Sequence, residues 1–203
     1  MAPKKQAGYK KALNGFKSDV SLLRAFAKGD ASAFESLYSR YKDQMFNHLC
    51  HQLGTHSAKF SAAEEIAQEV WMAVIRGADK FEDRSFTANS SFRAWLFSIA
   101  HRRIADFWRQ HYKHEEDLQN TENHESTEQP TSNEQEPEES RLIQELQRSL
   151  NTLPFEQRQS FLLREEGFSY QEIADITEAG VETVKSRLRY AKNSLQGLLE
   201  DVR

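Results

Sequence analysis

The sequence predicts an all-α protein in which two small helical domains are joined by a flexible acidic linker. Apolar residues recur at spacings of three and four over most of the chain, and its 203 residues include only 8 Gly and 4 Pro. Such periodicity is typical of amphipathic helices. Residues 114–140 hold one apolar residue, Leu118, which is too little apolar surface for folding. We therefore expect domains at 18–113 and 141–203, the second with a helix-turn-helix, and a disordered basic tail at 1–17.

Charge is distributed unevenly along the chain. Residues 114–140 contain ten Asp or Glu and no Lys or Arg, so leaving them out changes the formal net charge from −4 to +6. The folded parts are therefore basic, which favours nucleic acid as a partner. The single cysteine, Cys50, excludes an internal disulfide, and no apolar run is long enough for a signal peptide or membrane span. We expect a cytoplasmic protein without membrane insertion.

Two helices joined by a tight turn are expected at the start of the first domain. The apolar pattern begins near Asp19 and is interrupted at Gly29 and Asp30, where Asp30 is a suitable N-cap for the second helix. Their role is packing. His48 and His51 could share a helical face and suggest a metal site, but no complete ligand set with the required spacing follows, so we expect no metal and no cofactor.

Residues 61–75 predict an amphipathic helix with Ile66, Val70 and Val74 on its buried face and glutamates on its outer face. Acidic residues in a first turn stabilise a helix by themselves, so these glutamates need no partner to explain them. A docking face for another protein is the functional alternative.

A polar loop at 81–91, which contains Phe81 and Phe86, precedes a long helix expected at 91–112. Trp95, Trp108 and several arginines interleave on this helix, and cations with flat rings suit unpaired DNA. The same pattern also fits partly buried tryptophans with arginines extending past them to solvent. The residues alone leave both interpretations open.

The second domain begins with expected helices at 141–150 and 155–165, separated by Leu153-Pro154, and Gly167 is placed to end the second of them in a left-handed conformation. Ser169 and Glu172 then form a predicted capping box that starts a short helix. A second helix from about Val181 buries an apolar face and carries Lys and Arg on the other. This helix-turn-helix suits the DNA major groove, although an ordinary helical hairpin with a solvated basic face is the alternative.

Taken together, these segments resemble a bacterial RNA polymerase sigma factor of the sigma-70 family, extracytoplasmic-function class. The matching pieces occur in order as GDASAFESLYSRY, AEEIAQEVWMAVI, SFRAWLFSIAHRRIADFWR, LNTLPFEQRQSFLLREEGFSYQEIA and TVKSRLRYAK. The resemblance covers most of the chain outside the tail and the linker. It implies a protein that binds core polymerase, directs it to promoters and helps to open the DNA.

The resemblance also implies partners and site residues. The partners are the β′ clamp helices and the β flap of core polymerase, promoter DNA and an anti-sigma factor. The polymerase-binding residues would be Glu65, Gln68 and Glu69. The residues that bind the minus-ten element would be Trp95, Ser98, Arg102, Arg103 and Arg109. The residues that bind the minus-thirty-five element would be Thr183, Lys185, Ser186, Arg187 and Arg189.

The sequence departs from the family pattern at three positions. Arg102 stands where Asn is common, Glu178 replaces the usual glycine of the helix-turn-helix turn, and Gly180 replaces a Ser or Thr cap. Details of DNA recognition at these positions are therefore not carried over from the family.

Two other functions remain as alternatives. A stand-alone helix-turn-helix regulator would bind duplex DNA without polymerase, and a metal-dependent enzyme would use His48 and His51. The sequence contains no phosphate-binding loop, dinucleotide fingerprint or nucleophile motif, and we expect no enzymatic activity.

Overall fold

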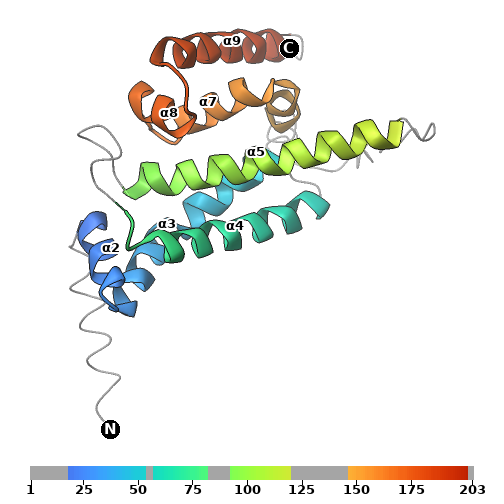
Figure 1. Cartoon of the computed structure of the whole chain (residues 1–203). Coiled ribbons are helices and arrows are strands. Elements are labelled where there is room, and N and C mark those ends of the chain that lie inside the picture. The colour runs from blue at the N-terminus through green and yellow to red at the C-terminus, as the bar shows by residue number, and fades with distance from the viewer. Residues whose placement is uncertain (1–17, 54–56, 82–91, 120–145, 201–203) are drawn as a thin grey trace, which may run out of the picture.

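The computed structural model describes residues 18–53, 57–81, 92–119 and 146–200 (Figure 1). Its helices confirm the all-α prediction, and these described residues contain no strand. The predicted basic tail, Phe86, positions 120–140 of the predicted linker and the start of the expected helix at 141–150 lie outside the described residues. Within the described parts of the chain, no helix is both long and apolar enough to cross a membrane.

Among the described residues, the N-terminal lobe contains four helices. They are α2 (Asp19–Ala27), α3 (Ala31–Leu53), α4 (Ser57–Gly77) and α5 (Phe92–Gln119). The turn between α2 and α3 forms as predicted. Gly29 takes a φ of 96°, which is favourable for glycine, and the Asp30 carboxylate caps α3 by accepting a hydrogen bond of 3.2 Å from the Ser32 amide.

Helix α5 is longer than the apolar pattern predicts. It continues past Tyr112 to Gln119, the first residues of the predicted linker included, and extends beyond its neighbours in Figure 1. Elongation of an existing helix adds one hydrogen bond per residue without a nucleation cost, so a polar extension needs no burial.

The C-terminal lobe consists of a helical segment at 146–152 followed by α7 (Phe155–Glu165), α8 (Tyr170–Ile176) and α9 (Val181–Glu200). Helix α7 has the predicted bounds. Gly167 follows it with a φ of 87°, which confirms the left-handed ending. The predicted capping box is also confirmed, because the Ser169 hydroxyl accepts from the Glu172 amide at 3.2 Å and the Glu172 carboxylate accepts from the Ser169 amide at 2.8 Å.

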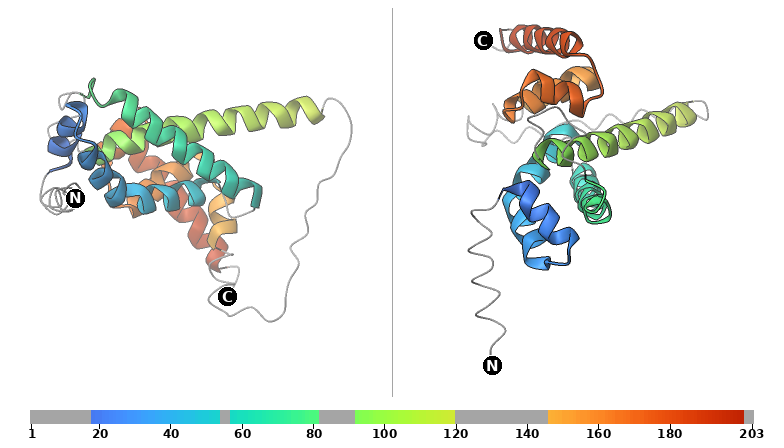
Figure 2. Two further views of the ribbon diagram at one scale, coloured as in Figure 1. Left: turned by 90° about the horizontal axis from the view of Figure 1, so that it is seen from below. Right: turned by 60° about the vertical axis from the view of Figure 1, so that its left-hand side comes forward.

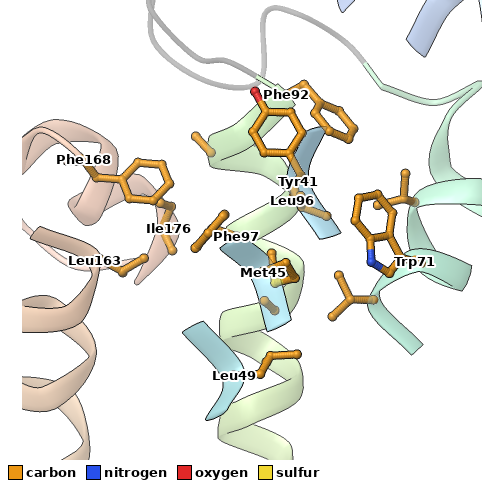
Figure 3. Packing of buried hydrophobic residues seen from close by; sticks show 14 of the residues in the cluster. Tyr41, Met45, Leu49, Trp71, Phe92, Leu96, Phe97, Leu163, Phe168 and Ile176 are labelled. Atoms are coloured by element: carbon orange, nitrogen blue, oxygen red, sulfur yellow. The ribbon is translucent and has the colours of Figure 1, made fainter. Parts of the chain in front are cut away.

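Helix α5 lies between the other helices of its own lobe and the C-terminal lobe (Figures 1 and 2). One hydrophobic core includes residues of both lobes. Figure 3 shows Phe97 of α5 close to Leu163, Phe168 and Ile176, and each of these four residues is almost fully buried. A second, smaller core lies within the C-terminal lobe, between α7, α9 and the segment before α7.

Candidate nucleic-acid and protein interfaces

The outer face of α4 is acidic and partly apolar. Glu65, Gln68 and Glu69 are exposed there, while Ile66, Val70 and Val74 are buried on the opposite side, as the pattern predicts. Two large apolar side chains, Met72 and Ile75, share the outer face and are 48% and 40% exposed. A contiguous apolar patch rimmed by polar residues is typical of a protein-docking face.

Trp95 occupies a partly buried position on α5. Its ring lies 5.0 Å from that of Phe81 and 6.0 Å from that of Phe92, measured between centroids. The backbone of Gly77 at the end of α4 comes so close that an added Cβ would lie 3.1 Å from the indole. Its ring is packed in an aromatic cluster and the residue is partly exposed, while contact with unpaired DNA stays a prediction.

The other predicted minus-ten residues have partners within the chain. Ser98 is buried, and its hydroxyl donates to the Trp95 carbonyl at 2.8 Å. Arg103 of α5 lies 3.4 Å from Glu69 of α4, beside a groove of about 210 Å³ between the two helices. Arg109 pairs with Asp106 one turn away at 2.8 Å, whereas Arg102 pairs with Glu178 of the C-terminal lobe.

The helix-turn-helix places α8 and α9 against each other through buried apolar residues. Ala174 of α8 is buried, as the steep crossing requires, together with Val184, Leu188 and Ala191 of α9. Glu178 in the turn takes a left-handed φ of 52°, the conformation that the usual glycine would adopt more easily. Residue 178 thus adopts the left-handed conformation without a glycine.

Four of the five predicted minus-thirty-five residues are exposed along one side of α9. These are Thr183, Lys185, Ser186 and Arg189. A 2.7 Å bond to Glu182 raises the pKa of the Lys185 ammonium, so this side chain stays cationic. Arg187 differs, because only 22% of its side chain is exposed and its guanidinium pairs with Glu156 of α7 at 2.9 Å.

His48 and His51 of α3 occupy different environments. His48 is buried against the ring of Phe97 with 5.0 Å between centroids, and His51 is exposed. Burial lowers the pKa of His48 to about 3, so its imidazole is neutral in the core. Among the described residues there is no cluster of three or more His, Cys, Asp or Glu side chains that could hold a metal ion.

Sequence reasoning missed three exposed side chains of these faces. Met72 and Ile75 lie off the buried stripe of α4 and follow Gln68 at helical spacing, which was a usable signal. Tyr190 on α9 is 52% exposed, with the Arg189 guanidinium 5.2 Å from its ring centroid. Its position among Lys and Arg on a predicted groove-binding helix could have identified it.

The chain is similar to known proteins in both lobes. Residues 37–114 match the family model for sigma-70 region 2, and residues 143–195 match that for sigma-70 region 4. The ECF RNA polymerase sigma-E factor of Escherichia coli (strain K12) is 29% identical over 194 residues, which are 90% of this chain and 95% of that protein. RNA polymerase sigma factor YlaC of Bacillus subtilis (strain 168) is 28% identical over 167 residues, 81% of this chain and 90% of YlaC.

Solved structures share the fold. CnrH in complex with the cytosolic domain of CnrY has a TM-score of 0.65 at 20% identity, over 91% of this chain and 99% of CnrH. The sigma factor RpoE in complex with the anti-sigma factor NepR from Bartonella quintana has a TM-score of 0.59 at 25% identity, over 84% of this chain and 98% of RpoE. With region 2 in the N-terminal lobe and region 4 in the C-terminal lobe, the chain belongs to the sigma-70 family as an extracytoplasmic-function sigma factor, a non-enzymatic protein that directs RNA polymerase to promoters.

Proposed function

We propose that the two lobes divide the work of promoter recognition between three faces. The outer face of α4 binds the β′ clamp helices through Glu65, Gln68 and Glu69, with Met72 and Ile75 adding apolar contact. Helix α5 binds the non-template strand of the minus-ten element and helps to open the DNA, and α9 binds the minus-thirty-five element. The C-terminal lobe also contacts the β flap.

The observation that carries this assignment is the two-sided character of α9. Val184, Leu188 and Ala191 are buried on the side that faces α7 and α8, while Thr183, Lys185, Ser186 and Arg189 remain exposed together. A helix that enters the major groove needs this arrangement, because cations contact phosphates and polar side chains contact base edges. The partly exposed Trp95 of α5 would provide a flat ring for an unstacked base.

The packed arrangement of the lobes differs from the one that promoter binding requires. The minus-ten and minus-thirty-five elements are separated by about 25 base pairs, or roughly 85 Å of duplex at 3.4 Å per base pair. Here α5 and α8 are in direct contact. We therefore expect the lobes to separate on polymerase. Two weak DNA-binding lobes on one enzyme then gain from effective concentration.

A protein inhibitor is a further expected partner. NepR is an anti-sigma factor in complex with the similar RpoE, and CnrH is in complex with the cytosolic domain of CnrY. We propose that an anti-sigma factor binds this chain as well, and that the chain acts in the cytoplasm, where polymerase is found.

Reconstitution with core polymerase tests the proposal. The chain should bind core and start transcripts at specific sites in a promoter library, and no binding to core would refute it. Gln68→Ala should weaken core binding by about thirtyfold, the change that corresponds to the roughly 2 kcal/mol of an interface hot spot. Glu65→Gln should weaken it as well, whereas Glu35→Gln, the same charge change at an exposed site of α3, should not.

The alternative function, a stand-alone regulator, is tested by binding to duplex DNA in the absence of polymerase. Such a regulator would bind a pseudo-palindromic duplex tightly without polymerase, and the Gln68 substitution would leave its activity unchanged.

A further inference from the structure

Two of the positions at which this sequence departs from the family pattern contact each other. The guanidinium of Arg102 on α5 donates to one oxygen of the Glu178 carboxylate, from Nη2 at 2.7 Å and from Nε at 3.1 Å. The residues are 76 positions apart and belong to different lobes. Arg102 stands where the family commonly has Asn, and Glu178 where it commonly has Gly, so neither usual residue could form this ion pair.

Hydrogen bonds hold the backbone around Glu178 in place. Glu178 lies in the turn between α8 and α9, and the next residue, Ala179, donates its amide hydrogen to the Ala174 carbonyl at 3.0 Å. Thr177 is buried, and its hydroxyl donates to the Ile173 carbonyl at 2.7 Å. With the turn held in this way, the Glu178 side chain meets α5 only when the lobes are packed together.

Other contacts between the lobes also hold this arrangement. Arg93 of α5 donates to the Glu166 carbonyl and lies 3.9 Å from the centroid of the Phe168 ring. Gln44 of α3 donates to the Glu166 carboxylate at 2.6 Å. Beside Arg102 and Glu178, a cleft of about 190 Å³ is also lined by Arg109, another proposed minus-ten residue.

We propose that Glu178 substitutes for a DNA phosphate at Arg102, so that the C-terminal lobe and single-stranded DNA compete for the same guanidinium. This inference rests on the proposed function, which assigns Arg102 to the minus-ten element. A carboxylate and a phosphate accept the same paired hydrogen bonds from arginine. While the lobes are packed, Arg102 is occupied, and DNA binding and lobe separation favour each other.

The ion pair between Arg102 and Glu178 is weak enough for DNA to displace it. Its side chains are 64% and 66% exposed, so water and salt screen their attraction. The buried rings of Phe97 and Phe168 contribute to the attraction between the lobes, and the ion pair affects how readily DNA reaches Arg102. Removing Glu178 should therefore shift the competition without unfolding either lobe.

Energy transfer between dyes on the two lobes tests the proposal in the full chain. In a Cys50→Ala background, cysteines replace the exposed residues Glu64 on α4 and Asn193 on α9 and carry the dyes. Addition of a random-sequence single-stranded oligonucleotide at low salt should reduce the transfer in this parent. Glu178→Gln should lower the midpoint oligonucleotide concentration by about twofold to fivefold, the range for an exposed ion pair.

Two controls separate the pair from a general charge effect. Glu165→Gln removes the same charge from an exposed site of the same lobe and should leave the midpoint unchanged. In an Arg102→Gln background, Glu178→Gln should have no further effect. The inference is wrong if Glu178→Gln behaves like Glu165→Gln, if its effect persists without Arg102, or if the oligonucleotide leaves the parent's energy transfer unchanged.

Transcription with core polymerase tests the proposed function separately. If the midpoints behave as expected and no promoter-specific transcript appears, the proposed function fails while competition at Arg102 stands. If transcripts appear and the midpoints do not shift, competition fails while the proposed function stands.

Discussion

The ring of Phe97 on α5 meets the ring of Phe168, which follows α7, with centroids 5.0 Å apart and planes inclined by 62°. Both side chains are almost completely buried, and the Arg93 guanidinium covers the face of Phe168. Regions 2 and 4, which match separate family models, therefore share one core in this arrangement. Edge-to-face rings and a cation over a ring add to the stabilisation from burial.

Phe168→Ala should destabilise the chain strongly, because it leaves a cavity between the lobes. We expect a loss of about 3–5 kcal/mol in the free energy of unfolding, the range for truncating a buried phenylalanine. Unfolding by guanidinium chloride, followed by circular dichroism, measures this loss. Phe60→Ala is the matched control, since Phe60 is 48% exposed and its truncation should cost much less. Equal losses from the two substitutions would show that the shared core contributes little.

Arg187→Ala should reduce the stability of the C-terminal lobe as well as DNA binding. Its guanidinium is largely buried and paired with Glu156, so truncation leaves that carboxylate without its partner. Lys185→Ala and Arg189→Ala should weaken binding to the minus-thirty-five element with little change in melting temperature, because both side chains are exposed. Thermal unfolding combined with filter binding to promoter duplex separates the two effects. Unchanged stability in Arg187→Ala would contradict this assignment.

Buried His48 should make stability depend on pH between neutral and mildly acidic conditions. Its pKa is about 3 in the fold and 6.5 in the unfolded chain, so between these values the unfolded state binds more protons. Its contribution to stability is therefore lost as pH falls below about 6.5, by up to about 1.4 kcal/mol per pH unit. Urea unfolding between pH 7 and pH 5, where carboxylates remain mostly ionised, measures the slope.

His48→Leu should flatten that slope by the equivalent of one proton. His51→Gln, a substitution at an exposed histidine of the same helix, should leave it unchanged. Identical slopes in the three proteins would show that His48 is not the responsible group.

Local structure could be predicted from the sequence because its causes are local. Asp30 and Ser169 cap helices within three residues, and Gly167 ends α7 through its own backbone freedom. Helical periodicity also identified the buried face of α4. It could not identify the partner of each face, because periodicity fixes which residues are buried and not which residues cover them.

The contacts between the lobes lie beyond such reasoning. Arg93 and Glu166 are 73 residues apart, and Arg102 and Glu178 are 76 apart. Each departure from the family pattern looked independent in the sequence, since nothing in local spacing connects α5 to the turn before α9. Arg187 shows the same limit, because its place among basic residues of α9 gave no sign of its pair with Glu156 on another helix.

Gly77→Ala should displace the ring of Trp95. The new Cβ would lie 3.1 Å from one ring carbon, which is tighter than most packed contacts, and an ordinary 3.5 Å from the next, so the ring must shift by a few tenths of an ångström. The chain has three tryptophans, so fluorotryptophan labelling should show one shifted resonance among three. Gly180→Ala is the control, because its Cβ would lie at an ordinary 3.6 Å from the Thr183 hydroxyl. Unchanged spectra in both variants would place the Trp95 ring elsewhere.

Glycine at position 178 should stabilise the helix-turn-helix relative to glutamine. Both substitutions remove the carboxylate that pairs with Arg102, so they differ mainly in the backbone, where a φ of 52° is strained for glutamine and easy for glycine. We expect Glu178→Gly to melt about 2 °C above Glu178→Gln, a shift in keeping with a chain of this size. At Glu182, inside α9, the order should reverse, because glycine weakens a helix. If glycine lowered the melting temperature at both positions, the left-handed conformation of residue 178 would be wrong, and with it the placement of the carboxylate against α5.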